Sequence, residues 1–123
     1  MVSHSKSVGL CLEAAAELEK EGISAEVINL RSIRPLDTDL IIKSVKKTNH
    51  LITVEGGWPH FGVGSEIAAA ILESEAFDYL DAPIERISGA DIPMPYAKNF
   101  EDRSLPNAQV IIKVVKRNLN IKN

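Results

Sequence analysis

The chain has 123 residues, a formal net charge of −3, 45% hydrophobic and 25% charged residues, which is the make-up of one ordinary soluble domain. No basic stripe is present and no apolar run approaches the ~20 residues that span a bilayer, so neither nucleic acid nor a membrane is an expected partner. The single cysteine, Cys11, excludes an intrachain disulfide framework and fits a reducing compartment.

The first residues, MVSHSKS, are interpreted as the end of a strand that leads directly into a helix. Such a stump is too short to hold a place in a sheet alone. We therefore expect a fragment of a longer chain, in which the first strand or strands are truncated and any targeting peptide is missing. The predicted organisation is a single domain over residues 1–123.

Apolar residues at spacings of three and four predict helices over about 7–21, 38–47, 63–73 and 107–119. Asp37 is a good N-cap for the second helix. Gly22, just past the first helix, occupies the position that favours a left-handed residue. The residues expected to face the core are Leu10, Cys11, Ala14, Ala15, Leu18, Leu40, Ile41, Val45, Ile67, Ala68, Ile71, Leu72, Val110, Ile111, Val114, Val115 and Leu119.

Between the helices, strands are predicted at 25–30, 50–55 and 84–88. The last of these alternates apolar and polar residues, as a strand at or near a sheet edge does. Residues 89–96 contain two prolines and are predicted to be a loop. Alternation of strands and helices predicts an α/β fold: three layers, α/β/α, on a mostly parallel sheet of about four to five strands.

In such a sheet, ligands bind at the carboxyl ends of the strands. Residues 31–35, 56–64 and 89–96 are expected to gather there. The middle segment lies in EGGWPHFGVGSE, where Gly62 and Gly64 have the spacing of a dinucleotide-binding motif but Ile67 takes the place of its third glycine. No Lys-Ser/Thr pair follows, so this is not a Walker loop.

The loop is therefore interpreted as a structural or interface element. Trp58 and Phe61 at its tip are expected to contact another surface, which makes them candidate partner-binding residues. Because a free helix N-terminus attracts anions, an anion is still possible on the amides of Gly64 and Ser65.

The three histidines, His4, His50 and His60, lack the spacing of metal ligands, and no metal site is predicted. His4 ends a strand at the ligand edge and is a candidate general acid or base. His50 is interpreted as structural. No complete active site is visible, so no catalytic or cofactor-binding residue is assigned.

Several long motifs resemble a known family. LEAAAELEKEGISAEVINLRSIRPLD, VKKTNHLITVEGGWPHFGVGSEIAA, AFDYLDAPIERISGADIPMPYAKNFED and LPNAQVIIKVV together cover nearly the whole chain. They resemble the C-terminal, transketolase-like domain of pyruvate dehydrogenase beta subunits in the 2-oxoacid dehydrogenase complexes. LRSIRPLD and GVGSEI are shared widely among transketolase-like domains, whereas YLDAPIERISGADIPMPYA and GGWPHFGVG point to the mitochondrial-type pyruvate enzyme.

The resemblance implies part of an oxidoreductase that decarboxylates pyruvate and acetylates lipoyl groups, leading from glycolysis to acetyl-CoA. In that family, thiamin diphosphate and Mg²⁺ are bound outside this domain, between the alpha subunit and the N-terminal domain of the beta subunit. The resemblance therefore implies no cofactor in this chain and no activity for the chain alone.

The implied partners are a second beta subunit, the alpha subunit of a heterotetramer, and the small basic subunit-binding domain of the dihydrolipoyl acyltransferase in the multienzyme complex. Asp81 of YLDAP is the matching position for an ion pair with that domain. Family members also use their C-terminal carboxylate in docking, and the ending NIKN extends the usual LNI-type ending by two residues, Lys122 and Asn123.

Two alternatives stay open. One is the beta subunit of a branched-chain 2-oxoacid dehydrogenase. The other, of a different class, is a free-standing nucleotide- or phosphate-binding module built on Gly62 and Gly64. The compartment follows from the resemblance alone: the mitochondrial matrix for a eukaryotic source, and the cytoplasm for a bacterial one.

Overall fold

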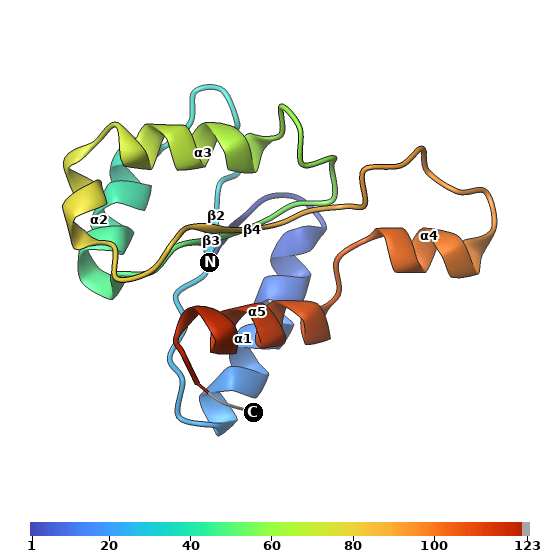
Figure 1. Cartoon of the computed structure of the whole chain (residues 1–123), viewed down its shortest axis with the longest axis horizontal. Helices are drawn as coiled ribbons and strands as arrows, with labels where there is room; N and C mark the ends of the chain where they lie inside the picture. The colour runs from blue at the N-terminus through green and yellow to red at the C-terminus, as the bar shows by residue number, and fades with distance from the viewer. Residues whose placement is uncertain (122–123) are drawn as a thin grey trace.

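A computed structural model describes residues 1–121, and four parallel strands form its centre (Figure 1). They are β1 (Val2–Ser3), β2 (Ile28–Asn29), β3 (Ile52–Val54) and β4 (Glu85–Ile87), in the spatial order β2-β1-β3-β4. The register pairs Val2 with Ile28 and Thr53, and Val54 with Ile87. The place of β4 at a sheet edge confirms the prediction from its alternating sequence.

Helices cover both faces of this sheet, as Figure 1 shows. On one face, α1 (Ser7–Lys20) packs against α5 (Ala108–Asn118); on the other, α2 (Thr38–Thr48), α3 (Val63–Leu72) and the short 3-10 helix η1 (Glu75–Tyr79) pack together. The three-layer α/β/α prediction is therefore confirmed. None of the helices in the described part is long and apolar enough to cross a bilayer.

Each face of the sheet has its own apolar core, and most of the predicted core residues lie in one of the two. Three predictions were wrong: Leu40, Leu72 and Val110 are 42%, 52% and 43% exposed. Each directly precedes or follows a fully buried isoleucine. Because neighbouring helical residues point about 100° apart, a stripe centred on the isoleucine turns its neighbour toward solvent.

The strands are shorter than predicted because few residues form backbone hydrogen bonds between strands. Central strand β1 pairs through two residues only, so β2 is regular at Ile28 and Asn29 within the predicted 25–30. Two short helices were not predicted. One is η1, which lies in the expected connector, and the other is α4 (Lys98–Ser104), which projects from the body on an extended arm (Figure 1).

The predicted N-cap of α2 is present, since Asp37 Oδ1 accepts a hydrogen bond from the Leu40 amide at 3.2 Å. Asp37→Ala is expected to lower the free energy of unfolding by about 1 kcal/mol, because it leaves this amide without its acceptor. Urea denaturation would measure the loss. Asp39→Ala, which removes the same charge from an exposed position in the first turn, is the control. Equal losses in the two variants would contradict a specific capping role.

Candidate functional site

The carboxyl ends of the strands bring two of the three predicted segments together. Gly89 donates its amide to Gly57 O at 2.8 Å, and the Trp58 indole donates to Ile92 O at 3.0 Å. His60 Nδ1 lies 3.0 Å from Asp91 Oδ2. These bonds join loop 56–62 to loop 89–96, whereas no hydrogen bond or ion pair within residues 1–121 ties 31–35 to them.

A buried carboxylate lies at the centre of this edge. Side chains alternate along a strand, so Thr53 and Glu55 point to the same face of the sheet, beneath the start of α3. Glu55 Oε2 accepts a hydrogen bond from the Gly64 amide at 3.0 Å. The N-cap of α3 is Gly62, which has no side chain to offer, so Glu55 caps the helix from the adjacent strand.

This geometry explains the two glycines of GVGSE. A Cβ on Gly62 would overlap Glu55 Oε1, and a Cβ on Gly64 would lie 2.7 Å from Thr53 Oγ1. The missing side chains of Gly62 and Gly64 therefore leave room for the Glu55 carboxylate and for Thr53 of β3. In a phosphate-binding loop, the same space would be occupied by phosphate. A second negative charge beside Glu55 is unfavourable, and this argues against the phosphate-binding alternative.

The amides of the suggested anion site already have acceptors within the chain. That of Gly64 is bonded to Glu55, and that of Ser65 donates to Gly62 O at 3.1 Å. An added anion would have to displace the carboxylate. Arg86, from β4, reinforces the turn by donating to Ser65 Oγ at 2.8 Å and to Pro59 O at 2.9 Å.

A cavity of about 350 Å³ opens beside the carboxylate. Its walls include Glu55, His4, Trp58, His60 and Phe61. Glu55 is only 6% exposed, whereas Trp58 is 54% exposed and Phe61 is fully exposed on a left-handed backbone. One acid among histidine and aromatic rings suits a positively charged group. Within residues 1–121, no group of three or more metal-ligating side chains is present.

Of the other chemical candidates, His4 follows β1 and lies on the cavity wall, so its predicted place at the ligand edge is confirmed. Its role as an acid or base stays a prediction. Burial raises the pKa of the Cys11 thiol, which is enclosed between α1 and the sheet. A thiol held in its neutral form is a poor nucleophile.

Asp81, the predicted ion-pair partner, lies at the opposite end of the sheet. Its amide donates to Asn49 O at 2.9 Å, just before β3 begins, whereas Trp58 and Phe61 follow the end of β3. The structure therefore does not bring the three predicted partner-binding residues together. Asp81 is exposed, and none of the ion pairs among the described residues includes it.

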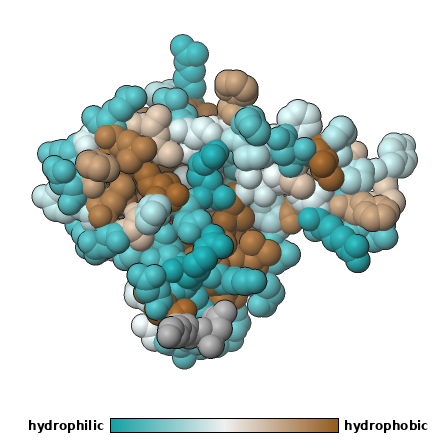
Figure 2. Space-filling model, in the orientation of Figure 1, coloured by the Kyte–Doolittle hydropathy of each residue, from teal (hydrophilic) through white to brown (hydrophobic). Residues whose placement is uncertain are grey.

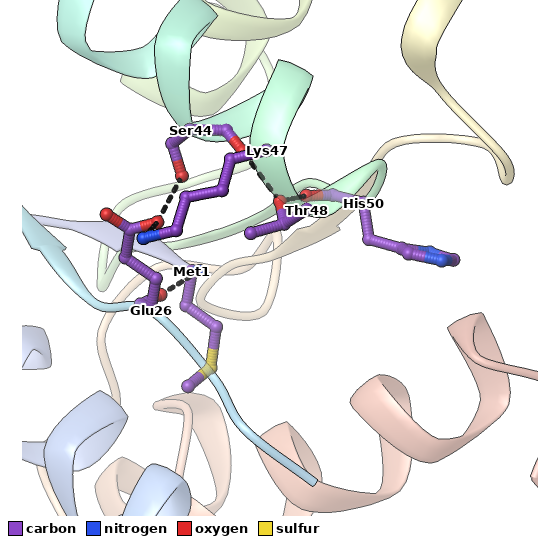
Figure 3. Close-up of polar contacts among 6 residues, drawn as sticks. All are labelled: Met1, Glu26, Ser44, Lys47, Thr48 and His50. Carbon is purple, nitrogen blue, oxygen red and sulfur yellow. Dashed lines mark hydrogen bonds and ion pairs between the residues drawn. The ribbon is translucent and has the colours of Figure 1, made fainter.

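A second, smaller cavity of about 90 Å³ lies at this amino end, between α2 and α5. Figure 3 shows its polar side: Ser44 Oγ donates to Glu26 Oε2 at 3.2 Å, and Thr48 Oγ1 donates to His50 O at 3.2 Å. The His50 ring points away from this group and lies 2.8 Å from Asn118 Oδ1. The polar side chains around this cavity, including the His50 ring, have hydrogen-bond partners within the chain, in agreement with the structural interpretation of His50.

Sequence reasoning missed Glu55 and Arg86. Glu55 is the first residue of the glycine-rich stretch EGGWPHFGVGSE and has no predicted role. The signal was present: strand periodicity places an acid at the end of a buried run on the face of the following helix. Arg86 is one alternating polar residue of β4, and its bonds to the Pro59–Ser65 turn depend on tertiary packing.

Comparison with known proteins defines the class. The family model of the transketolase C-terminal domain matches residues 1–111, and the chain belongs to this family. A solved split-gene transketolase, described as an inactive beta4 tetramer, superposes with a TM-score of 0.82 at 25% identity. That match covers 99% of this chain and 38% of the solved one.

Within this class, the chain is more similar in sequence to one enzyme subunit than to the solved transketolase. It is 62% identical over 121 residues to the pyruvate dehydrogenase E1 component subunit beta, mitochondrial, of Homo sapiens, and 62% identical over 123 residues to that of Saccharomyces cerevisiae. The Caenorhabditis elegans protein of this name is 55% identical. The matches cover 98–99% of this chain, which spans about a third (34%) of the length of these relatives.

Proposed function

We propose that this chain is the C-terminal domain of the beta subunit of a mitochondrial pyruvate dehydrogenase. The observation that carries the proposal is the 62% identity over 98% of the chain to subunits of that name. A branched-chain 2-oxoacid enzyme is the alternative within the same chemistry, and the names of these relatives favour pyruvate.

In the proposed enzyme, the domain's role is assembly. Thiamin diphosphate and Mg²⁺ belong to the part of the enzyme outside this chain, and within residues 1–121 no metal-ligating cluster offers a site for the ion. The chain's contributions are contacts with the alpha subunit, with a second beta subunit and with the acyltransferase. The exposed Trp58 and Phe61 are proposed to contact a neighbouring chain of this assembly.

The amino end of the sheet is proposed to dock the basic subunit-binding domain of the acyltransferase. The two lysines in the last turn of α2 are already paired, Lys46 with Glu75 at 2.6 Å and Lys47 with Glu26 at 3.6 Å. The hydrogen bond to Glu75 raises the pKa of Lys46. Arg117 pairs with Glu85 at 2.8 Å. Asp78 and Asp81 are exposed and outside the described ion pairs, so this end presents unpaired negative charge to a basic partner. The suggested use of the C-terminal carboxylate lies outside the described residues.

Asp81→Asn tests this docking surface. Titration calorimetry of the chain with the subunit-binding domain of a dihydrolipoyl acyltransferase is expected to show binding, which Asp81→Asn weakens by about 0.2–1 kcal/mol at low salt. The affinity of the variant should also fall less steeply as salt is added, because one pair of opposite charges is missing.

Asp102→Asn is the matched control, since it removes the same charge from exposed α4, at the other end of the molecule in Figure 1. It should bind as the unmodified chain does. Unchanged affinity of Asp81→Asn across the salt series would remove Asp81 from the surface. Micromolar nucleotide binding with no response to the subunit-binding domain would overturn the proposed function itself.

A further inference from the structure

The cavity beside Glu55 contains a buried carboxyl group that forms no ion pair within the described part of the chain. Glu55 is 6% exposed, and none of the ion pairs formed within residues 1–121 includes it. Burying a carboxylate in this way is unfavourable until a cation pairs with it. A cation that reached this carboxylate would therefore bind favourably.

The helix start compensates this charge only in part. Oε2 of Glu55 accepts the Gly64 amide, but no hydrogen bond of the described residues reaches Oε1, which faces Gly62. A carboxylate can accept about four hydrogen bonds, so Glu55 retains free acceptor capacity. Arg86 of the same chain is not its partner, because its guanidinium is bound to Pro59 O and Ser65 Oγ.

The walls of the cavity favour a guanidinium over other cations. Trp58 and Phe61 offer aromatic rings, on which a planar guanidinium stacks while it donates to a carboxylate. His60 also lines the cavity, and its Nδ1 lies 3.0 Å from Asp91 Oδ2. A divalent metal ion is disfavoured, since the described residues provide no cluster of three ligands.

The surroundings indicate that the guanidinium comes from a protein. The arm after β4 carries exposed apolar side chains, and Figure 2 shows hydrophobic surface on it. They are Ile92, Met94, Tyr96 and Phe100, which are between 48% and 107% exposed. Trp58 donates a hydrogen bond to Ile92 O, so the start of this arm lies beside the cavity. An arginine anchored at the centre of an apolar contact is a common arrangement of protein interfaces.

We propose that the cavity of Glu55, Trp58 and Phe61 receives an arginine side chain from a neighbouring protein chain. The arginine donates to Glu55 Oε1 and stacks on the aromatic rings. This inference rests on the proposed contact between the Trp58–Phe61 tip and a neighbouring chain. It is independent of docking at Asp81, which lies at the other end of the sheet.

The test uses Trp58 as a reporter, because it is the only tryptophan of the sequence. The whole chain is titrated with N-acetyl-L-arginine amide and, separately, with N-acetyl-L-citrulline amide, which has nearly the same shape and no charge. The arginine compound is expected to change Trp58 fluorescence saturably, and to bind at least about tenfold more tightly than the citrulline compound, as a charge-assisted pair implies.

Glu55→Gln should abolish this preference, because the amide keeps an oxygen for the Gly64 amide and loses the charge. Glu66→Gln is the matched control: it removes an exposed charge from the same first turn of α3 and should keep the preference. Circular dichroism checks that both variants fold. If Glu55→Gln does not fold, the comparison of arginine with citrulline on the unmodified chain still decides.

Two results would overturn the inference. Equal saturable responses to both compounds would show that Trp58 lies in a binding surface that does not recognise the charge of arginine. The absence of any saturable response to the arginine compound would remove the site altogether. Neither result bears on calorimetry with the subunit-binding domain, which tests the proposed function at the opposite edge.

Discussion

Gly64→Ala is expected to lower the free energy of unfolding by about 1–3 kcal/mol, because the added methyl group would lie 2.7 Å from buried Thr53 Oγ1. Gly9→Ala is the control, since Gly9 is also helical but has nothing within 4 Å of an added Cβ. It should raise stability by about 0.5–1 kcal/mol through helix propensity. Urea denaturation of both variants would measure this difference in sign.

A double-mutant cycle tests the cause. The Thr53 hydroxyl is buried without a hydrogen-bond partner, so Thr53→Ala removes the clashing atom without breaking a bond. Gly64→Ala should therefore be less destabilising in the Thr53→Ala background, by about 0.5–3 kcal/mol. Strictly additive losses would show that Gly64 is required for another reason.

Ile71→Ala is expected to lower the free energy of unfolding by about 2–5 kcal/mol, the largest effect predicted for this chain. Ile71 is fully buried in the core between α2, α3 and the sheet, and its loss would leave a cavity. Leu72→Ala, at the next residue of α3, should change stability by less than about 0.5 kcal/mol, because Leu72 is 52% exposed.

Thermal or urea denaturation of the two variants would decide which face of α3 packs inward. A larger loss for Leu72→Ala in the isolated chain would contradict the packing described. If Leu72→Ala destabilised only an assembled enzyme, its side chain would instead belong to a subunit contact.

The fold followed from local patterns. Spacings of three and four predicted the four long helices, and the capping residue Asp37 and the left-handed residue Gly22 (φ +80°) were predicted as well. The residues that were wrongly predicted to be buried, such as Leu40 and Val110, lie at the margin of the apolar face of their helix. A single sequence does not show which margin the neighbouring layer covers.

The candidate site was predictable only in outline. Its location at the carboxyl edge and the exposure of Trp58 and Phe61 were expected from parallel topology and loop composition. The capping role of Glu55 was not expected, because it depends on how closely the end of β3 packs against the start of α3. The spacing of Gly62 and Gly64 alone does not distinguish a phosphate motif from close packing, because the group that fills the space beside a glycine is a neighbour in the fold.

The opposite positions of Asp81 and Glu55 have a consequence for assembly. Asn49 accepts a hydrogen bond from the Asp81 amide, and Gly56 follows Glu55; the two residues lie seven positions apart on a nearly extended chain, or about 20 Å. Partners bound at the two proposed sites would therefore contact opposite edges of the sheet. The length of the strands would then set the distance between the two binding sites.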